Sequence, residues 1–399
     1  MRENFNQNLH NIKLSPIIAI SEEARAIAPI YEKNTGRQFI YFQRGEIDQP
    51  TFKEISDEVK SALDKGKTKY PISGGSKEVK EALLRKLESY NKIDGLSLDD
   101  VVVTSGGQEA LNMSIDLFRT GRGAGFSPIW SVLVENFIPY SGIDFTEIPF
   151  NEDFSIDFRN LEKTLSSGLD FFYLNNPHNP TGKVFTEEEL TIVGRLCKKN
   201  NVCIISDEAY DYVIFDGKKH ISIASLPEMK NYEDIFTAYT FSKTFSMTGF
   251  RLGYLVTKNK IASNLIKNMQ YTHTAGVPTM IQEVAVNVFS LKDQIENMVH
   301  VFEERRNKLY DSLTKINGLK VSKPEGAFYM FPDFSKLILG YDNQDGKYIY
   351  RKFLENGICV IPGKDFTKTS YFNNFARISF SMASLPSIGE GVKRMQEIF

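Results

Sequence analysis

The sequence is poor in the residues from which metal centres and disulfide frameworks are built. Its 399 residues include three cysteines, five histidines and one tryptophan. The cysteines, Cys197, Cys203 and Cys359, show no C-x-x-C spacing, and the last two lie in apolar runs, so we expect reduced, buried thiols. No two histidines have the i, i+4 spacing of a helical metal site, and we therefore expect no metal.

Long apolar runs and blocks of like charge are also lacking. No stretch of about eighteen apolar residues could span a bilayer, so we expect a soluble chain with no membrane partner. Residues 1–14 lack the apolar core and cleavage site of a signal peptide, and a cytoplasmic location is expected. Basic residues number 48 and acidic residues 50, without a block of five like charges, so we expect no nucleic-acid partner.

Two nucleotide-binding motifs are incomplete. Gly66-Lys67-Thr68 ends like a phosphate-binding P-loop, but the position that must be glycine is Ser61. The run that starts at Gly121 begins like a Rossmann fingerprint, but Phe126 stands where the third glycine is needed. Both nucleotide-binding classes are therefore excluded.

Short apolar runs alternate with helical patterns along much of the chain. Strand-like runs lie at residues 101–103, 171–174, 202–205, 235–239 and 252–256. Several lack polar alternation, which is typical of strands that are covered on both faces. Thr186 and Glu189 form a capping-box pattern that opens a helix to about residue 200. Residues 171–205 therefore predict a β-α-β unit, in which ligands bind beyond the carboxyl ends of the strands.

The length of the chain favours two domains, because one hydrophobic core rarely grows to this size. From about residue 280 to 316 the pattern becomes helical and charged. Residues 320–330 and 358–361 then form strand-like runs that are separated by helical segments. This second part predicts a smaller α+β domain.

Lys243 follows one of the predicted buried strands. Most lysines are solvated, and alone this one would be interpreted as a surface residue. However, the hydroxyls of Thr240 and Ser242 and the guanidinium of Arg251 are the donors that a phosphate dianion requires. A nearby cation also lowers the pKa of a lysine towards a nucleophilic amine. The group therefore indicates an anion site beside a reactive lysine.

Three more polar segments follow predicted strands. Asp207 could cap the next turn, or it could hold a pyridine nitrogen protonated, with Tyr210 beside the phenolic oxygen of the same ring. Asn179 lies in a turn between two prolines, where an Asn-Pro bond is a candidate for cis geometry. Gly106 and Gly107 open a predicted helix, whose free N–H groups can bind phosphate.

These four segments together resemble the class I/II aminotransferases of pyridoxal phosphate fold type I, of the aspartate and aromatic aminotransferase kind. The resemblance covers nearly the whole chain and extends to residues 45–48, 128–130, 324–329, 362–366 and 376–380. It implies an α/β fold, with a three-layer αβα large domain at residues 48–285 built on a mostly parallel sheet. Residues 1–47 and 286–399 would form the smaller α+β domain.

The resemblance also implies the cofactor, pyridoxal 5′-phosphate, and the residues that hold it. Lys243 would be the Schiff-base lysine, Asp207 the partner of the pyridine nitrogen, and Tyr210 with Asn179 the partners of the ring hydroxyl. The phosphate would be held by Arg251, Thr240, Ser242 and the segment Gly106, Gly107 and Gln108.

Four further residues have implied roles around this cofactor. Trp130 would stack on the ring, although a lone tryptophan in an apolar stretch is also a core residue. Arg377 would bind the substrate α-carboxylate, assisted by Asn179 and by the backbone of Gly45. Tyr70 would reach the phosphate of the neighbouring subunit, unless it is an ordinary surface aromatic. A homodimer is therefore implied.

The predicted reaction is a ping-pong transfer of the amino group of an L-amino acid to a 2-oxo acid, with 2-oxoglutarate as the expected acceptor. The donor would be aspartate or an aromatic or neutral amino acid. Gln108 weakens the case for aspartate, because some members of the family that are specific for acidic substrates carry a lysine at this position. A β-eliminating C–S lyase on the same scaffold is an alternative, since the fold does not decide the fate of the carbanion. A non-enzymatic regulator would need a DNA-binding helix pair before residue 45, where no basic pair is found.

Overall fold

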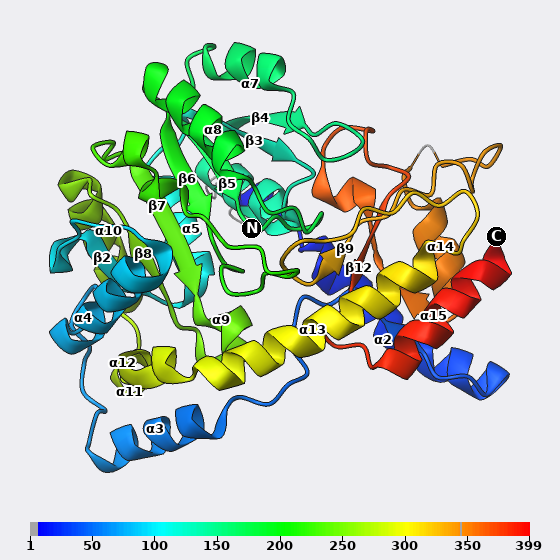
Figure 1. The fold of residues 1–399 in the computed structure, drawn as a ribbon, viewed down its shortest axis with the longest axis horizontal. Helices are drawn as coiled ribbons and strands as arrows, with labels where there is room; N and C mark the ends of the chain where they lie inside the picture. The colour runs from blue at the N-terminus through cyan, green and yellow to red at the C-terminus, as the bar shows by residue number, and fades with distance from the viewer. Residues whose placement is uncertain (1–6, 344) are drawn as a thin grey trace, which may run out of the picture.

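The computed structural model describes residues 7–343 and 345–399. Its centre is a seven-stranded sheet of strand order β2-β8-β7-β6-β5-β3-β4 (Figure 1). The strands are β2 (Val101–Thr104), β3 (Arg122–Ser127), β4 (Asp144–Pro149), β5 (Phe171–Asn175), β6 (Cys203–Asp207), β7 (Ile235–Thr240) and β8 (Gly253–Val256). Only β8 runs against its neighbours β7 and β2. The expected α/β fold with a mostly parallel sheet is confirmed.

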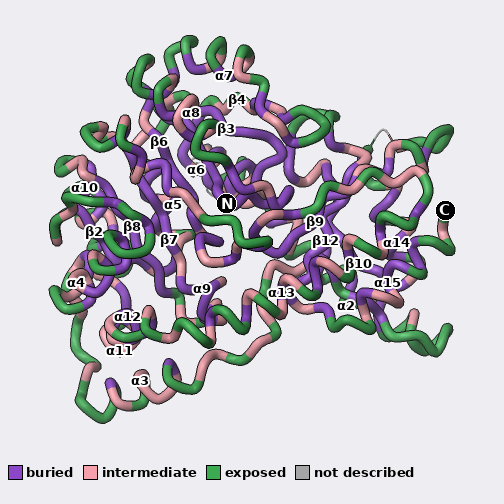
Figure 2. Tube along the Cα trace, in the orientation of Figure 1, coloured by how far each residue is buried: buried purple, intermediate pink, exposed green. Residues whose placement is uncertain are grey.

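Side chains alternate between the two faces of this sheet. Because the side chains on both faces are apolar, each face is covered by a layer of helices. Phe172 and Leu174 of β5 pack in one apolar cluster with residues of α7 (Phe158–Leu165) and α8 (Glu187–Lys199). Phe171 and Tyr173 pack in another cluster with residues of α5 (Gly106–Asp116) and α10 (Lys260–Thr274). Every residue of β5 is buried, as the lack of polar alternation predicted. Figure 2 shows the buried strands inside the more exposed helices.

The predicted β-α-β unit is present as β5, α8 and β6. Thr186 caps α8, and both capping-box hydrogen bonds form: Glu189 N donates to Thr186 Oγ1 at 3.2 Å, and Thr186 N donates to Glu189 Oε2 at 2.9 Å. The two strands pair in parallel, with Asn175 opposite Asp207. The polar segments that follow them therefore meet at one edge of the sheet.

The smaller part of the molecule contains two short sheets. One is the antiparallel sheet β11-β12-β9, formed by β9 (Tyr329–Met330), β11 (Ile361–Pro362) and β12 (Ala376–Ser379). The other is the parallel pair of β1 (Ile40–Tyr41) and β10 (Ile358–Cys359). Because β1 comes from the start of the chain and β10 from its end, segments near both ends of the chain contribute here. The predicted boundaries at residues 47/48 and 285/286 stay a prediction, and residues 1–6 lie outside the described residues.

The remaining α-helices surround these sheets. They are α1 (Gln7–His10), α2 (Pro16–Thr35), α3 (Lys53–Asp64), α4 (Lys77–Lys86), α6 (Ile138–Ser141), α9 (Phe241–Thr244), α11 (Thr279–Gln282), α12 (Val284–Asn287), α13 (Lys292–Leu313), α14 (Tyr348–Glu355) and α15 (Leu385–Ile398). Among the described helices, none is both long and apolar enough to cross a membrane. In Figure 1, α13 runs from below the large sheet to the smaller part of the molecule.

Two local expectations are corrected. The strand-like run at residues 320–330 forms a strand only at Tyr329–Met330, because Glu325 and Gly326 turn to donate to the carbonyl of Gly182 at 2.8 and 2.9 Å. Cys197 and Cys359 are buried free thiols, but Cys203 is only half-buried, since it lies at the first position of β6.

Candidate active site

A cavity of about 860 Å³ lies beyond the carboxyl ends of β6 and β7. The N-terminal end of α5, residues from α2 and residues from the smaller part of the molecule also line it. The lining includes twelve of the fourteen predicted site residues: Gly45, Gly107, Gln108, Trp130, Asn179, Asp207, Tyr210, Thr240, Ser242, Lys243, Arg251 and Arg377. Folding thus brings together side chains that lie more than 300 residues apart in the sequence.

Lys243 lies in the short helix α9, directly after β7. Its Nζ donates a hydrogen bond to the carbonyl of Gly45 at 2.6 Å. Burial and the nearby cationic group of Arg377 lower the pKa of Lys243 to about 8. A large fraction of the amine is therefore neutral in mildly alkaline solution, as a nucleophile or a general base must be.

Asp207 ends β6 and is buried, with 6% of its surface exposed. Burial raises the pKa of Asp207 to about 6, while hydrogen bonds from Tyr173 and from the backbone N–H of Ala209 oppose that rise. Three residues later, Tyr210 shares a hydrogen bond of 3.0 Å with the hydroxyl of Tyr329. A carboxylate and a phenol thus lie at neighbouring points of the cavity wall.

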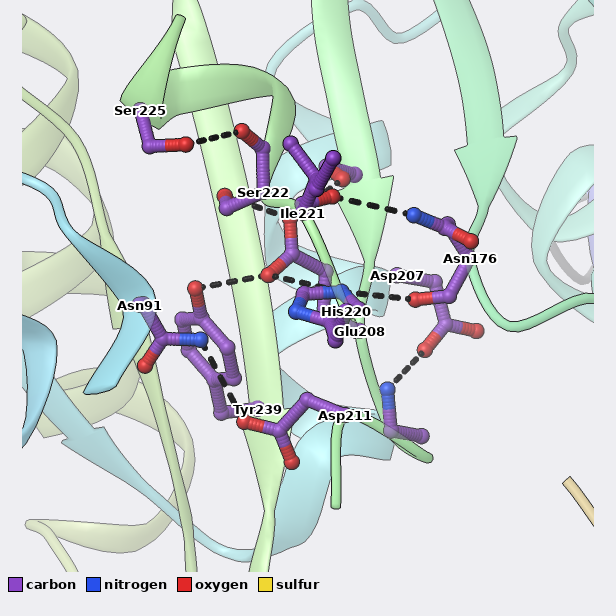
Figure 3. A network of polar contacts seen from close by, with 12 residues as sticks. Asn91, Asn176, Asp207, Glu208, Asp211, His220, Ile221, Ser222, Ser225 and Tyr239 are labelled. Carbon is purple, nitrogen blue, oxygen red and sulfur yellow. Dashed lines mark hydrogen bonds and ion pairs between the residues drawn. The ribbon is translucent and has the colours of Figure 1, made fainter. Parts of the chain in front are cut away.

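Next to Asp207, the side chain of Glu208 joins the end of β6 to β7 and to the segment 220–222 (Figure 3). Ser222 and Tyr239 donate hydrogen bonds to its carboxylate, each at 2.7 Å. The Nε2 atom of His220 lies 3.5 Å from the same carboxylate. These contacts hold the ends of β6 and β7 together, and with them the positions of Asp207 and Lys243.

Another part of the cavity wall carries the donors that a phosphate requires. Gly107 is the second residue of α5 and lies beside Thr240: a Cβ atom added to this glycine would meet Thr240 Cβ at 3.2 Å. The hydroxyl of Thr240 donates to that of Ser242 at 2.9 Å. The guanidinium of Arg251 lies against Gly106, where an added Cβ atom would meet Nη2 at 2.6 Å. Hydroxyls, a guanidinium and free helical N–H groups therefore lie together on one part of the cavity wall.

Arg377 lies on β12 and is buried, with 1% of its surface exposed. Its Nη1 donates to Asn179 Oδ1 at 3.2 Å and its Nη2 to the carbonyl of Gln43 at 2.6 Å. The Nε atom is buried and has no hydrogen-bond partner among the described residues. A buried cation on the cavity wall with an unsatisfied donor fits a carboxylate ligand.

The loop that carries Asn179 is held rigidly against the strand before it. The backbone N–H of Asn179 donates to Asn175 Oδ1 at 2.7 Å. The bonds Asn176–Pro177 and Asn179–Pro180 are both cis, as predicted for an Asn-Pro bond in this loop. The side chain of Asn179 therefore has a defined position beside Arg377.

Two predicted site residues do not line the cavity of this chain. Gly106 lies behind the guanidinium of Arg251, with a backbone φ of +76° that suits glycine. Tyr70 lies on the surface outside the cavity, with 93% of its area exposed. Among the described residues, no group of three or more His, Cys, Asp and Glu side chains is arranged to hold a metal ion.

Sequence reasoning missed two tyrosines of the site. Tyr329 lines the cavity, and its ring lies 4.3 Å from the guanidinium carbon of Arg377. It belongs to the segment 324–329, to which no role was assigned. The hydroxyl of Tyr173 donates to Asp207 at 2.8 Å, although its place in an apolar strand predicted only a core residue. The sequence carries no signal for this second contact.

Comparisons with known proteins agree with this geometry. The sequence model of the family "Aminotransferase class I and II" matches residues 37–393. An aspartate aminotransferase from Sulfurisphaera tokodaii is 32% identical over 99% of this chain and 97% of its own length. The aromatic-amino-acid aminotransferase 2 of Thermococcus litoralis is 31% identical over 89% of this chain and 90% of its own.

Solved structures show the same likeness in three dimensions. The aspartate aminotransferase of Thermus thermophilus, solved with maleate, superimposes with a TM-score of 0.88 and 25% identity. The superposition covers 100% of both chains. The likeness therefore extends over the fold of the whole chain.

Proposed function

The chain belongs to the class I and II aminotransferase family, and from this premise we propose which residues carry its reaction and which substrates it takes. It is a pyridoxal-phosphate-dependent transaminase. The eliminating lyase that the sequence left open has no support from the relatives named above, which are aminotransferases. The regulator without enzymatic activity is likewise not supported.

The residues around the cavity fit pyridoxal phosphate at both of its ends. Lys243 would hold the cofactor as a Schiff base, and the carboxylate of Asp207 would pair with the ring nitrogen. Tyr210 and Asn179 would bind the ring hydroxyl, and Trp130 would lie on the ring face. The phosphate would be bound by Arg251, Thr240, Ser242 and the segment Gly106, Gly107 and Gln108. When bound, the cofactor supplies an electron-withdrawing ring that stabilises negative charge at the substrate α-carbon.

The pKa of Lys243, about 8, suits it to proton transfer. Once its Nζ is free, it is the general base that removes the proton from the substrate α-carbon and the general acid that returns it. Its hydrogen bond to Gly45 O keeps the amine at the substrate side of the cavity. Burial supports this role, because excluded water cannot compete for the proton.

Arg377 would bind the α-carboxylate of the amino acid. The unpaired Nε and the two partly engaged Nη atoms make a planar set of donors that fits a carboxylate. Asn179 and the backbone of Gly45 would assist from either side. The ring of Tyr329 supports the guanidinium face and fixes its plane.

The proposed donor is aspartate or an aromatic or neutral amino acid, with 2-oxoglutarate as the acceptor. Relatives named as aspartate and as aromatic aminotransferases support both kinds of donor. Arg25 and Arg44 also line the cavity and offer charge for a second carboxylate. Gln108 argues for a wider choice of donor, because glutamine forms no ion pair. We further propose a cytoplasmic homodimer in which Tyr70 reaches the neighbouring cofactor phosphate.

A screen of the purified holoenzyme against a panel of L-amino acids with 2-oxoglutarate tests this proposal. We expect glutamate to form with aspartate or an aromatic donor, and the visible absorption of the lysine-bound cofactor to fall with the donor and return with the acceptor. Lys243→Ala should lose that absorption and the turnover. Pyruvate and ammonia formed without a keto acid, or normal turnover of Lys243→Ala, would contradict the proposal.

A further inference from the structure

The hydroxyl of Tyr173 is the side-chain donor that contacts Asp207. It donates to Asp207 Oδ2 at 2.8 Å. The contact is set by the pairing of β5 with β6, in which Tyr173 lies opposite Ile205 and Asn175 opposite Asp207. Residues two apart on a strand share a face, so the phenol extends along the sheet to the carboxylate. Tyr173 is 2% exposed and Asp207 6%.

The surroundings of Asp207 make this hydrogen bond important. Burial disfavours the ionised carboxylate, and the charge of Glu208 acts in the same direction. Against them act the hydrogen bond from Tyr173, the backbone N–H of Ala209 at 3.2 Å from Oδ1, and the more distant charge of Lys243. Tyr173 is the largest of these opposing influences. Each carboxylate oxygen also keeps a lone pair for a further partner.

A phenylalanine would serve the core of β5 equally well. Tyr173 is flanked by Phe172 and Leu174 in a strand whose residues are all buried. A buried hydroxyl needs a partner, and this one has its partner in the carboxylate at the cavity wall. The hydroxyl of Tyr173 therefore serves to donate a hydrogen bond to Asp207 and adds nothing to the apolar packing of β5.

We propose that Tyr173 is a positioning residue for transamination, which keeps Asp207 ionised and directs its carboxylate towards the ring nitrogen of the cofactor. The inference rests on the role proposed above for Asp207. A carboxylate that accepts a hydrogen bond is less basic, so the shared proton stays on the ring nitrogen. Without the phenol, the proton should shift towards Asp207, and the ring should lose electron-withdrawing power.

The test is ¹⁵N NMR of the holoenzyme reconstituted with cofactor labelled at the ring nitrogen. In Tyr173→Phe, we expect the nitrogen signal to move towards that of neutral pyridine, and kcat to fall on the order of tenfold with little change in KM. The matched control is Tyr232→Phe, because Tyr232 donates to the carbonyl of Val202 at 2.8 Å, beyond the opposite end of β6. This control should keep the wild-type signal.

Two further variants distinguish a failure of the inference about Tyr173 from a failure of the proposed role of Asp207. Incorporation of 3-fluorotyrosine at position 173 keeps the shape but makes the phenol a stronger donor, so the signal should move in the opposite direction even if Tyr173→Phe folds poorly. Asp207→Asn should remove the protonated-ring signal. An unchanged signal in both Tyr173 variants, with a clear change in Asp207→Asn, would overturn the inference about Tyr173 and leave the proposed role of Asp207 intact. An unchanged signal in Asp207→Asn would instead overturn the proposed role of Asp207.

Discussion

At the scale of residues, the reactivity of Lys243 depends on its neighbours. An ordinary lysine is protonated at neutral pH and is therefore neither a nucleophile nor a base. Here the chain buries the amine and places Arg377 and Arg251 nearby, which lowers the pKa of Lys243. The same burial that disfavours the charged lysine raises the pKa of Asp207. Burial in the same cavity thus lowers the pKa of Lys243 and raises the pKa of Asp207.

Lys243 should therefore titrate well below an ordinary exposed lysine in the protein freed of cofactor. We expect its acylation by acetic anhydride to rise with pH around a midpoint of about 8. The measurement is mass spectrometry of the peptide that contains Lys243 at each pH. Lys53 is an internal control, because its ion pair with Asp57 raises its pKa. Equal midpoints for the two lysines would contradict the assignment.

The same shift has a consequence for stability. Folding lowers the pKa of Lys243, so the unfolded chain binds more protons than the folded chain between about pH 8 and the ordinary pKa of 10.5. The contribution of Lys243 to the free energy of unfolding therefore rises with pH across this window. The direction is opposite to that of a lysine in an ion pair.

At the scale of elements, the end of α4 is attached to the sheet by a buried charge. Lys86 is the last residue of α4, and its Nζ donates to Asp211 Oδ2 at 2.5 Å. The side chains of the two residues are 3% and 6% exposed. The Nζ atom also lies 4.3 Å from the centre of the ring of Tyr239 on β7. A cation among tyrosines thus joins a surface helix to the strand that leads to Lys243.

Replacing Lys86 with methionine should be strongly destabilising. It keeps the volume but leaves Asp211 as a buried charge, and we expect the free energy of unfolding to fall by about 3–5 kcal/mol. Urea denaturation followed by tyrosine fluorescence measures the loss. The double variant Lys86→Met/Asp211→Asn should recover part of it, because the unpaired charge is gone.

Lys53→Met is the matched control for this experiment. Lys53 pairs with Asp57 on the surface of α3, where the lysine side chain is 86% exposed. Exposed ion pairs contribute little, so the denaturation curve should stay close to that of the wild type. Similar curves for Lys86→Met and Lys53→Met would show that the buried pair does not hold α4 in place.

At the scale of the whole molecule, the cavity depends on segments from both ends of the chain. Arg305 of α13 pairs with Asp48 at 2.7 Å and also donates to the carbonyl of Ser381. The long helix therefore holds the segment after Gly45 close to the segment after Arg377. Such contacts fix the positions of Gly45 and Arg377 relative to the rest of the cavity. A second subunit would complete the phosphate side through Tyr70.

The proposed homodimer predicts a mass of twice 45.4 kDa in sedimentation and a specific pattern of complementation. Lys243→Ala and Tyr70→Phe should each be impaired. In a mixed dimer of the two variants, one site has Lys243 from one subunit and Tyr70 from the other, so turnover should recover. The measurement is activity after the two proteins are unfolded together and refolded.

The control for complementation places both changes in one chain. A mixed dimer of wild type with the double variant Tyr70→Phe/Lys243→Ala has no site with both residues intact. Separated from the homodimers, this mixed dimer should therefore be less active than the mixed dimer of Lys243→Ala with Tyr70→Phe. Equal or higher activity of this purified mixed dimer would show that Tyr70 does not act across the interface.

The local part of this structure was predictable from the sequence. The capping box at Thr186 and Glu189 places the start of α8 through contacts only three residues apart. The unalternating apolar runs predict buried strands, and Asp207 and Lys243 follow directly from the ends of two of them. Lys243, Asp207 and Asn179 were found because each lies in a short segment with recognisable chemistry, whereas Arg377 was predicted only through the resemblance to the aminotransferases.

Other features depend on which segments become neighbours in space. The reversed direction of β8, the exposure of Tyr70 and the contact of Tyr329 with Arg377 have no local signal. Tyr173 is the clearest case, since its sequence surroundings are those of a core residue. Strand patterns determine which residues are buried, whereas only the register of β5 against β6 decides that a buried phenol meets a carboxylate. The sequence by itself therefore determined the elements and most of the residues of the site, and the tertiary structure decided how those residues change one another's chemistry, because hydrogen bonding and burial act between groups that are distant along the chain.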